Sequence, residues 1–348
     1  MRETPLQIGR PSVSEIAKLA GVSKSTVSLV LNNRPHVSDG MRKRVLDALE
    51  TLQNQPSETP RLKGPFKILL LHPAHMGSIQ VFRELLQGIH RGIEDVGGRL
   101  TLAVHQPPLH PNHTTNVLLL DPTLRPHGVL LMGALRDDPI LDVLRKENLP
   151  TVLVARETAF DGFSAVGMDN FKGAKEAVRY LIQLGHRRIA FLGGNEQYEY
   201  TRNRLAGYRD ALAEAGIPTE QYVYLGKGDD AAQALLSNAS LSPIPSLPVT
   251  AIFFVNDEHA SQALPVLQKR GIRIPKDLSV IAFDDTEIMA QWDPPISSVA
   301  VPRLEIGVLA VKSLVEQITR PYIESIRIIL GTQLHIRDTS IGPPLGKE

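Results

Sequence analysis

The chain has 348 residues, of which 42% are hydrophobic and 22% are charged, and it contains no cysteine. This composition is typical of a soluble globular protein, and the length exceeds what one hydrophobic core usually organises. The lack of cysteine excludes disulfides, thiol nucleophiles, iron–sulfur clusters and the common zinc fingers. The sequence has neither the roughly 20 consecutive apolar residues of a membrane-spanning helix nor the apolar run of a signal peptide. We therefore expect a cytoplasmic protein without a membrane partner.

Positive charge gathers at the N-terminal end of the chain. The formal net charge is only +1, but residues 1–64 contain ten Lys and Arg against six Asp and Glu. The rest of the chain is therefore slightly acidic. A basic segment of this size is compatible with an anionic partner such as nucleic acid, and equally with a solvated helical surface.

Two short amphipathic helices joined by a tight turn are predicted near the N-terminus. The first covers residues 12–20 and ends at Gly21, which tolerates the left-handed backbone that closes a helix. The second covers residues 24–31 and begins after Ser23, a good N-cap residue. Its apolar stripe consists of Val27, Val30 and Leu31. Such a pair indicates a helix-turn-helix, whose second helix enters the major groove of DNA.

A third helix, a linker and an alternation of strands and helices follow. The helix is predicted from Ser38 to Leu52, and the segment 54–65 is rich in Gln, Pro, Ser and Thr, as linkers are. Predicted strands lie at 67–71, 100–104, 128–132, 151–154, 188–192, 250–255 and 279–283, and predicted helices at 82–96, 171–184, 204–215 and 259–270. The alternation predicts parallel sheets covered by helices, and about 280 residues suffice for two α/β lobes.

The second helix presents a polar face opposite its apolar stripe. This face carries Lys24, Ser25, Ser28 and Leu29. Lys can donate to guanine O6 and N7, Ser is permissive, and an outward Leu can pack on a thymine methyl group. The same residues also fit a solvated face on which Leu29 packs against the third helix. The pattern by itself leaves both interpretations open.

Several sequence motifs resemble those of one known family. The ungapped stretch SEIAKLAGVSKSTVSLVLN at 14–32, followed by His36-Val37-Ser38, closely resembles the DNA-binding head of the lactose-repressor/galactose-repressor (LacI/GalR) family. Further motifs look like that family's effector-domain landmarks, in the same order: RLAGY at 204–208, ND at 256–257, GIRIP at 271–275 and SVIAFDD at 279–285. The resemblance implies a homodimeric repressor whose affinity for double-stranded operator DNA is set by a small-molecule effector.

The same resemblance implies an α/β fold with an all-α head and a bilobed core like that of periplasmic binding proteins. We place the helix-turn-helix domain at 1–55, the hinge at 56–65, and the effector-binding and dimerisation core at 66–348. Within the core, we assign about 66–168 and 298–326 to the N-lobe, and about 169–297 and 327–340 to the C-lobe. The two parallel α/β subdomains would hold the effector between them.

The residues expected to act are found at the family's contact positions. For DNA they are Ser14, Ser23, Lys24, Ser25, Thr26, Ser28, Leu29, Asn32, His36 and Leu62. For the effector, Arg204, Asn256 and Asp284 match the family's positions, with Phe82 and Trp292 as apolar walls. A forked cation, an amide and a carboxylate can together bind hydroxyls or an anion. Taken singly, the polar residues also fit structural hydrogen bonds at strand ends, and the aromatic residues fit core packing.

Three departures from the family pattern limit what can be carried over. Leu29 stands where the family usually has Arg, so the operator sequence cannot be inferred from relatives. Ala155, before Arg156, stands where sugar-binding relatives often carry Asp, which weakens the expectation of a sugar effector. The hinge has an extra proline, and Gly64-Pro65 would end its helix after about six residues, a length that is marginal even on DNA. We therefore expect a weak minor-groove wedge at Leu62.

Catalysis and metal binding have little support in the sequence. Gly193-Gly194 follows a predicted strand, but the chain has neither GxGxxG nor GxxxxGK[ST]. The pairs His72/His75 and His110/His113 lack the partners of a metal site. Asp284-Asp285 are adjacent in an extended strand and should point to opposite faces. We therefore expect no enzyme activity, no cofactor and no metal.

Two other classes of protein account for the sequence less completely. A periplasmic solute-binding protein would explain only the core and would need a signal peptide. A cytoplasmic α/β enzyme with a helical head would need a nucleophile or a cofactor loop. After the last predicted strand, at 330–337, only residues 338–348 remain, and they are too few for the heptads of a tetramerising coiled coil. A homodimer formed through the core is the expected assembly.

Overall fold

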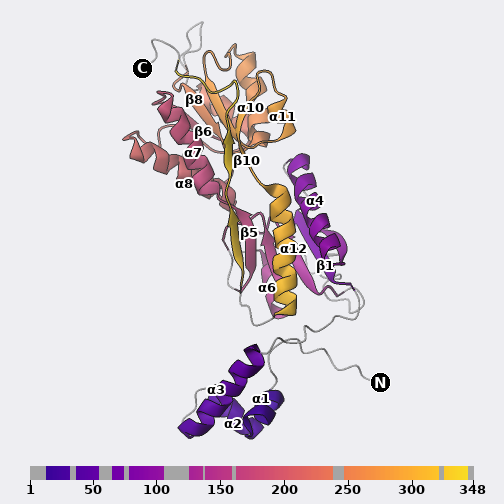
Figure 1. Ribbon diagram of the computed structural model, residues 1–348. Helices are drawn as coiled ribbons and strands as arrows, with labels where there is room; N and C mark the ends of the chain where they lie inside the picture. The colour runs from indigo at the N-terminus through magenta and orange to yellow at the C-terminus, as the bar shows by residue number, and fades with distance from the viewer. Residues whose placement is uncertain are drawn as a thin grey trace.

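The computed structural model describes residues 13–31, 37–54, 65–73, 78–105, 125–135, 138–158, 162–237, 247–320 and 325–343. These residues form a helical head and two α/β lobes, drawn in Figure 1. Most of the predicted hinge lies outside the described residues, as do Asn32, His36 and Leu62. The expectations for them stay predictions.

The head is built from helices α1 (Val13–Ala20), α2 (Lys24–Leu31) and α3 (Asp39–Asn54). A small apolar cluster holds them together and consists of Ile16, Ala17, Ala20, Val27, Val30, Val45 and Ala48. Gly21 closes α1 with a φ of +62°, in the left-handed region. The Ser23 Oγ accepts a hydrogen bond from the Thr26 backbone N–H at 3.1 Å and so caps α2. The predicted turn and cap are confirmed.

The N-lobe is a parallel sheet in the order β11-β5-β4-β3-β1-β2. Its strands are β1 (Lys67–Pro73), β2 (Arg99–His105), β3 (Gly128–Met132), β4 (Thr151–Val154), β5 (Ser164–Met168) and β11 (Arg327–Leu330). Its helices in the described part of the chain are α4 (Ile79–Asp95), α6 (Pro139–Lys146) and α12 (Arg303–Thr319). The central strands β3, β4 and β5 are buried along their whole length, as expected of strands covered on both faces.

The C-lobe repeats this architecture, with its sheet ordered β12-β10-β9-β8-β6-β7. Its strands are β6 (Ile189–Leu192), β7 (Val223–Tyr224), β8 (Ala251–Phe254), β9 (Ser279–Asp284), β10 (Ser297–Ala300) and β12 (Gln333–His335), of which β12 runs antiparallel to β10. Its helices are α7 (Asn170–Gln183), α8 (Glu199–Glu214), α9 (Gly228–Ser237), α10 (Asp257–Lys269) and α11 (Glu287–Ala290). Two parallel α/β lobes were predicted, and they are confirmed.

The lobes exchange strands at positions that the sequence did not indicate. Strand β10 pairs with β9, with Ser297 opposite Ile281, and therefore belongs to the C-lobe. Strand β11 pairs with β5, with Arg327 opposite Ala165, and belongs to the N-lobe. The predicted lobe boundaries, 298–326 and 327–340, are wrong at these two strands. Each strand has only four residues, and its own sequence does not specify which of the two sheets it joins.

Helices α4 and α12 of the N-lobe touch backbone to backbone. A Cβ added at Gly88 would lie 2.1 Å from the Leu304 carbonyl oxygen, and one added at Gly307 would lie 2.5 Å from the Leu85 carbonyl oxygen. Neither position can therefore hold a side chain without moving a helix. The two helices lie side by side in Figure 1 and form one rigid unit.

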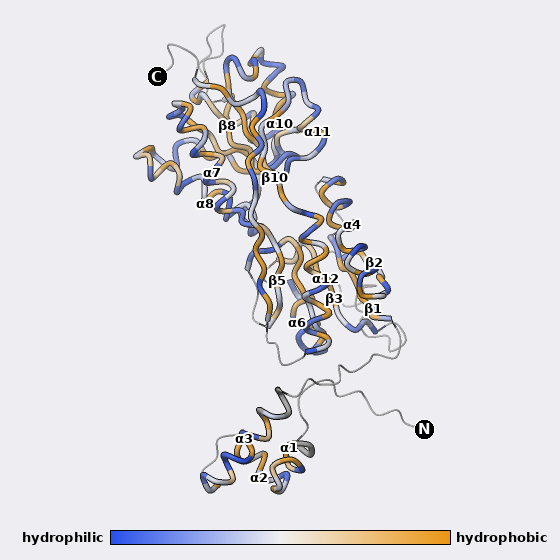
Figure 2. Tube along the Cα trace, viewed as in Figure 1, coloured by the Kyte–Doolittle hydropathy of each residue, from blue (hydrophilic) through white to orange (hydrophobic). Residues whose placement is uncertain are grey.

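Hydrophobic and polar residues are distributed differently between the sheets and the helices that cover them. Much of the buried central part of each sheet is coloured hydrophobic in Figure 2, while polar residues lie mainly on the outer helices and loops. In the part of the chain that the structure describes, no helix is both long and apolar enough to cross a membrane.

Candidate functional site

The polar residues predicted to bind an effector follow strands of the C-lobe sheet. Asn256 comes two residues after β8 ends, and Asp284 is the last residue of β9. Arg204 lies on α8, which follows β6. Strands β6, β8 and β9 are parallel neighbours, so their carboxyl ends meet at one edge of the sheet, where ligands of open α/β sheets bind.

Arg204 is only 3% exposed and is held by three different elements. Its Nε donates to the Asn170 Oδ1 at 2.8 Å, its Nη1 to the Val255 carbonyl oxygen at 2.7 Å, and its Nη2 to the Asp284 Oδ1 at 3.3 Å. The guanidinium lies over the Phe283 ring, 3.6 Å from its centroid. Since a guanidinium has five N–H groups, two take no part in these three hydrogen bonds. The structure thus brings Arg204 and Asp284 together, as predicted.

Burial and charge act in opposite directions on Arg204. Removal from water lowers the pKa of the guanidinium, while the negative charge of Asp284 raises it. An arginine starts from so high a pKa that it stays charged in proteins. Burying a charge without its partner costs free energy, so the Arg204 cation and the Asp284 carboxylate each stabilise the other inside the protein.

Asn256 serves the protein as a helix cap. Its Oδ1 accepts hydrogen bonds from the His259 backbone N–H at 2.9 Å and from the His259 Nδ1 at 2.6 Å, at the start of α10. Burial, together with the positive charge of Arg204, lowers the pKa of His259 to about 4, so the ring is neutral at pH 7. The structural role considered for Asn256 is therefore present, and its role in effector binding stays a prediction.

The Asp284-Asp285 pair sits on an unusual backbone. Their φ angles are +109° and +54°, values that residues other than glycine rarely adopt. The two side chains diverge, as predicted: Asp284 meets Arg204, while Asp285 accepts a hydrogen bond from the His335 Nδ1 at 2.6 Å and forms an ion pair with the Arg337 Nη1, which lies 2.6 Å from its Oδ1. Strand β12 thereby anchors the turn that presents Asp284. The sequence alone did not identify Asp285 as a residue that positions Asp284, although two adjacent Asp residues at the end of a strand are a pattern that indicates such a role.

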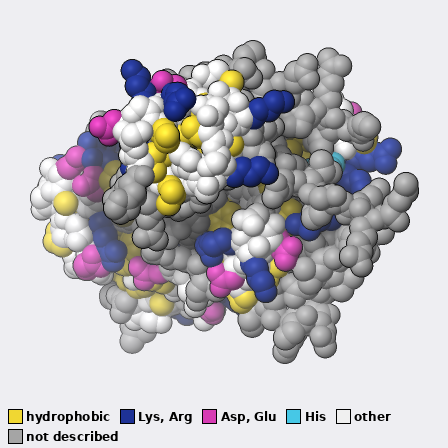
Figure 3. All heavy atoms as spheres, turned by 90° about the horizontal axis from the view of Figure 1, so that it is seen from below, with side chains coloured by type: hydrophobic (Ala, Val, Ile, Leu, Met, Phe, Trp, Pro, Cys, Tyr) yellow, Lys and Arg dark blue, Asp and Glu magenta, His cyan; other side chains and the backbone are white. Residues whose placement is uncertain are grey.

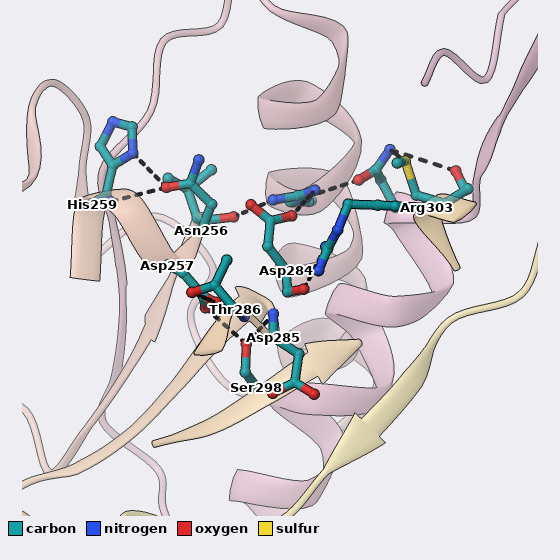
Figure 4. A network of polar contacts seen from close by, with 12 residues as sticks. Asn256, Asp257, His259, Asp284, Asp285, Thr286, Ser298 and Arg303 are labelled. Carbon is teal, nitrogen blue, oxygen red and sulfur yellow. Dashed lines mark hydrogen bonds and ion pairs between the residues drawn. The ribbon is translucent and has the colours of Figure 1, made fainter. Parts of the chain in front are cut away.

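Asp257 is a second acid that the sequence did not reveal as part of this network. It is 2% exposed. Its Oδ2 accepts from the Thr286 backbone N–H at 2.6 Å and from the Thr286 Oγ1 at 2.9 Å, and its Oδ1 accepts from the Ser298 Oγ at 2.8 Å (Figure 4). Burial and the nearby Asp284 charge raise the pKa of Asp257 to about 7. The acid ties the start of α10 to β10 and to the turn after Asp284.

Two further residues next to Arg204 were not predicted. Asn170, the first residue of α7, accepts from Arg204 and donates its backbone N–H to the Glu157 Oε1 at 2.8 Å. The Tyr200 ring, one turn before Arg204 on α8, lies 5.2 Å from the guanidinium carbon. Burial raises the pKa of Tyr200, and its hydroxyl stays protonated at pH 7. An aromatic ring one helical turn from Arg204 was the one signal in the sequence.

The aromatic residues Phe82 and Trp292 are placed in the cores of different lobes. Phe82 is half-buried against the N-lobe core, with its ring centroid 4.9 Å from that of His72. Trp292 is half-buried against the apolar cluster between α10 and the C-lobe sheet. The structure does not bring them into the Arg204 network, which fits the core-packing interpretation. Their role as walls of an effector site stays a prediction.

Arg156, which follows the departure at Ala155, links the two lobes. Ala155 turns the chain with a φ of +58°, and the Arg156 Nε then lies 3.2 Å from the Glu199 Oε2 at the start of α8. Both side chains are nearly buried. This part of the chain therefore supplies an ion pair between the lobes.

The face of α2 predicted to read DNA is open to solvent. Lys24 and Ser25 are exposed, Thr26 is half-buried, and Leu29 is 41% exposed. The packing of Leu29 on the third helix is therefore not observed. Ser14 and Ser28 lie on α1 and α2, but their side chains fall outside the described residues. Seen from below in Figure 3, Lys and Arg side chains are spread over the surface with acidic ones among them.

The described residues contain no cluster suited to ligating a metal ion. No group of three or more His, Asp or Glu side chains suited to a metal ion occurs there. His72 contacts its neighbour Pro73 through Nδ1 and packs on Phe82. His75, His110 and His113 lie outside the described ranges.

Comparisons with known families match both parts of the chain. The model for "Bacterial regulatory proteins, lacI family" matches residues 12–57, and that for "Periplasmic binding protein-like domain" matches residues 178–340. The ribose operon repressor of Escherichia coli (strain K12) is 32% identical over 332 residues, which cover 92% of this chain and 96% of that protein. The probable HTH-type transcriptional repressor ExuR of Bacillus subtilis (strain 168) is 28% identical over 335 residues, 94% and 98% of the two chains.

A solved structure agrees over almost the whole length. The transcriptional regulator CelR in complex with cellobiose superposes with a TM-score of 0.70 at 28% identity, covering 95% of this chain and 100% of that one. Both the head and the bilobed core of this chain therefore have counterparts in CelR, whose structure was solved with a disaccharide.

Proposed function

This chain belongs to the lacI family of bacterial regulatory proteins, and from that premise we propose that it represses transcription as a homodimer on two-fold operator DNA, with a small neutral sugar as effector. It is a DNA-binding transcriptional regulator with an effector-binding core. The reported relatives are transcriptional regulators. We accordingly propose a cytoplasmic protein with neither catalytic activity nor a cofactor.

The observation that carries the effector proposal is the Arg204–Asp284 pair at the carboxyl edge of the C-lobe sheet. Two Arg204 N–H groups and the Asp284 Oδ2 remain for a ligand, which is the donor and acceptor pattern that hydroxyl groups match. The nearby arginines are neutralised in the same way, Arg156 by Glu199 and Arg303 by Glu84. A charge-balanced site favours a neutral polyhydroxyl ligand over an anion. CelR, solved with cellobiose, supports the same class.

For DNA, we propose that Lys24, Ser25 and Leu29 contact base edges in the major groove. They are exposed on one face of α2, whose opposite face is buried in the head. Lys24 would donate to guanine and Leu29 would pack on thymine methyl groups. Ser14, Thr26, Ser28, Asn32 and His36 would complete the interface, while Ser23 acts through its capping bond.

The homodimer is proposed to form through the core. Strand β2 is an edge strand of the N-lobe sheet, and its Leu102 and Val104 are 45% and 47% exposed. An exposed apolar edge strand is a pairing surface that monomers normally avoid. We expect sedimentation velocity at micromolar concentration to show a dimer. A monomer or a tetramer would contradict the assignment.

The experiment that tests the function is selection of duplexes from random DNA. The full chain should enrich a two-fold sequence and bind it with a steep salt dependence, because phosphate contacts release counterions. Deletion of residues 1–64 should abolish this binding and leave thermal unfolding of the core intact. Cellobiose and D-ribose, added in a sugar panel, are the first probes for a change in duplex affinity. Unchanged duplex binding by the deletion variant would refute the proposal.

A further inference from the structure

The first turn of α4 in the N-lobe reaches the first residue of α11 in the C-lobe. The Glu287 backbone N–H donates to the Gln80 Oε1 at 2.8 Å. The Gln80 Nε2 in turn donates to the Glu84 Oε1 at 2.7 Å, one turn further along α4. Gln80 therefore joins the C-lobe to an acid of the N-lobe by two hydrogen bonds.

The second oxygen of this acid continues the connection. The Arg303 Nε donates to the Glu84 Oε2 at 2.6 Å. Arg303 is 5% exposed, and its Nη1 donates to the main-chain oxygen of Asp284 (Figure 4). The series of contacts thus begins at Glu287, crosses α4 and α12, and ends at Asp284. Both of its ends lie in the C-lobe, and its middle lies in the N-lobe.

The middle of this series is closely packed. Glu84 lies on α4 and Arg303 begins α12, and the glycines at 88 and 307 hold the two helices in backbone contact. A displacement of the Asp284 turn must therefore either break the Arg303 contacts or move both helices together. Packed elements of this kind transmit small shifts because they cannot deform continuously.

Burying Arg303 needs a reason beyond stability. In this pair the Arg303 side chain is buried and that of Glu84 is half-buried. An ion pair withdrawn from water rarely stabilises a fold more than apolar residues of the same size would, and its best attested use is to specify a single arrangement. Here the arrangement specified is that of one lobe against the other. Arg303 reaches the backbone of Asp284, whose side chain pairs with Arg204.

We propose that Gln80, Glu84 and Arg303 form an interlobe latch that holds the Asp284 turn and α11 against α4, so that contact of an effector with Asp284 is transmitted to the N-lobe. The three are positioning residues, since they act on Asp284 through its backbone. Only the transmission step rests on the proposed function. The holding of the lobes does not need an effector.

The absence of cysteine allows a direct test on the full chain. Cysteines introduced by Lys146→Cys and Lys269→Cys, both exposed and one in each lobe, carry nitroxide labels for pulsed electron resonance distances. The labelled chain is mixed with an excess of unlabelled chain, so that a labelled protomer is paired with an unlabelled one. The measured distance then lies within a single protomer. Glu84→Gln and Gln80→Leu are the latch variants. Arg83→Gln is the matched control, since Arg83 lies on the same turn of α4 and pairs with Glu287 at 3.7 Å but is exposed.

We expect one main interlobe distance in the parent chain and the Arg83→Gln control, because exposed ion pairs contribute little. Glu84→Gln should raise the fraction of a longer distance by roughly tenfold, since it removes a charge-assisted hydrogen bond. Gln80→Leu should raise it by roughly fivefold. Unchanged distances in both variants, or an equal shift in the control, would overturn the latch.

A second readout keeps the test separate from the proposed function. The emission of Trp292, the single tryptophan of the chain, reports the packing after α11 and should change in the latch variants but not in Arg83→Gln. Duplex affinity is measured in parallel, with cellobiose as the probe. Failure of the parent chain to bind any duplex would refute the proposed function, while the distances would still decide the latch.

Discussion

The face of α2 that we propose reads DNA and the Arg204 network of the C-lobe are built on opposite principles. Lys24 and Ser25 are exposed and lie next to each other in the chain. Arg204 is 3% exposed, and its carboxylate partner Asp284 is 80 positions away. One site is a row of solvent-exposed side chains on a short helix, and the other is a set of buried charged groups that pair with one another.

This difference separates recognition from folding. Replacing an exposed residue of α2 should remove a proposed contact with DNA and leave the head packed on Val27 and Val30. Replacing a member of the Arg204 network leaves its partners unpaired inside the protein, which costs stability as well as binding. The two sites should therefore respond to mutation in different ways.

The largest effect is expected from Arg204→Ala. The change leaves Asp284 and the Asn170 Oδ1 without their donor, so the free energy of unfolding should fall by about 3–5 kcal/mol. The response of duplex affinity to a sugar that acts on the parent chain should weaken tenfold or more, with duplex binding itself retained. Chemical denaturation and duplex titrations measure the two effects. Arg202→Ala, on the exposed side of the same helix, is the control, and a full sugar response in Arg204→Ala would place the effector elsewhere.

Lys24→Ala should act on DNA alone. Loss of a donor to a base edge is expected to cost about 1–3 kcal/mol of duplex binding and to relax sequence preference at one position. Thermal unfolding should not change, because Lys24 is exposed. Fluorescence anisotropy with the selected duplex and single-base variants provides the measurement. A uniform loss on all duplexes would instead identify Lys24 as a phosphate contact.

Leu62→Ala should have a smaller effect than Lys24→Ala. The hinge sequence ends at Gly64-Pro65 after about six residues, too few for a stable helix, so a minor-groove wedge should be weak. We expect a loss below about 2 kcal/mol and little change in DNA bending, measured by gel mobility of circularly permuted duplexes. A larger loss together with the disappearance of a kink would show that the hinge wedge is formed.

The smallest effect concerns Asp257 and the dependence of stability on pH. Burial raises the pKa of Asp257 from 3.8 to about 7. Between these two pH values the folded chain binds more protons at this acid than the unfolded chain does. The contribution of Asp257 therefore lowers the free energy of unfolding as the pH rises through this range. His259, with its pKa lowered from 6.5 to about 4, has the opposite effect between pH 4 and 6.5. Asp257→Asn isolates the acid: its melting temperature relative to the parent chain should increase from pH 5 to pH 8. A constant or decreasing difference would contradict the raised pKa.

The sequence by itself predicted those features that depend on interactions between residues close together in the chain. The Ser23 cap spans three residues, Gly21 takes its positive φ by itself, and the stripe of Val27 and Val30 follows from helical periodicity. The buried strands of both lobes stand out as apolar runs between turn residues. The family resemblance then predicted that Arg204 and Asp284 would meet, which neither residue shows alone.

Only the tertiary structure decided what depends on distant pairing. Arg303 and Glu84 are 219 positions apart, and no pattern in either helix indicates that they touch. The assignment of β10 and β11 to lobes, the burial of Asp257 and the anchoring of Asp285 by β12 arise in the same way. Caps and helical periodicity depend on residues a few positions apart, so the sequence predicts them. Whether a charged side chain can be buried depends instead on which partner the folded chain brings within about 3 or 4 Å of it.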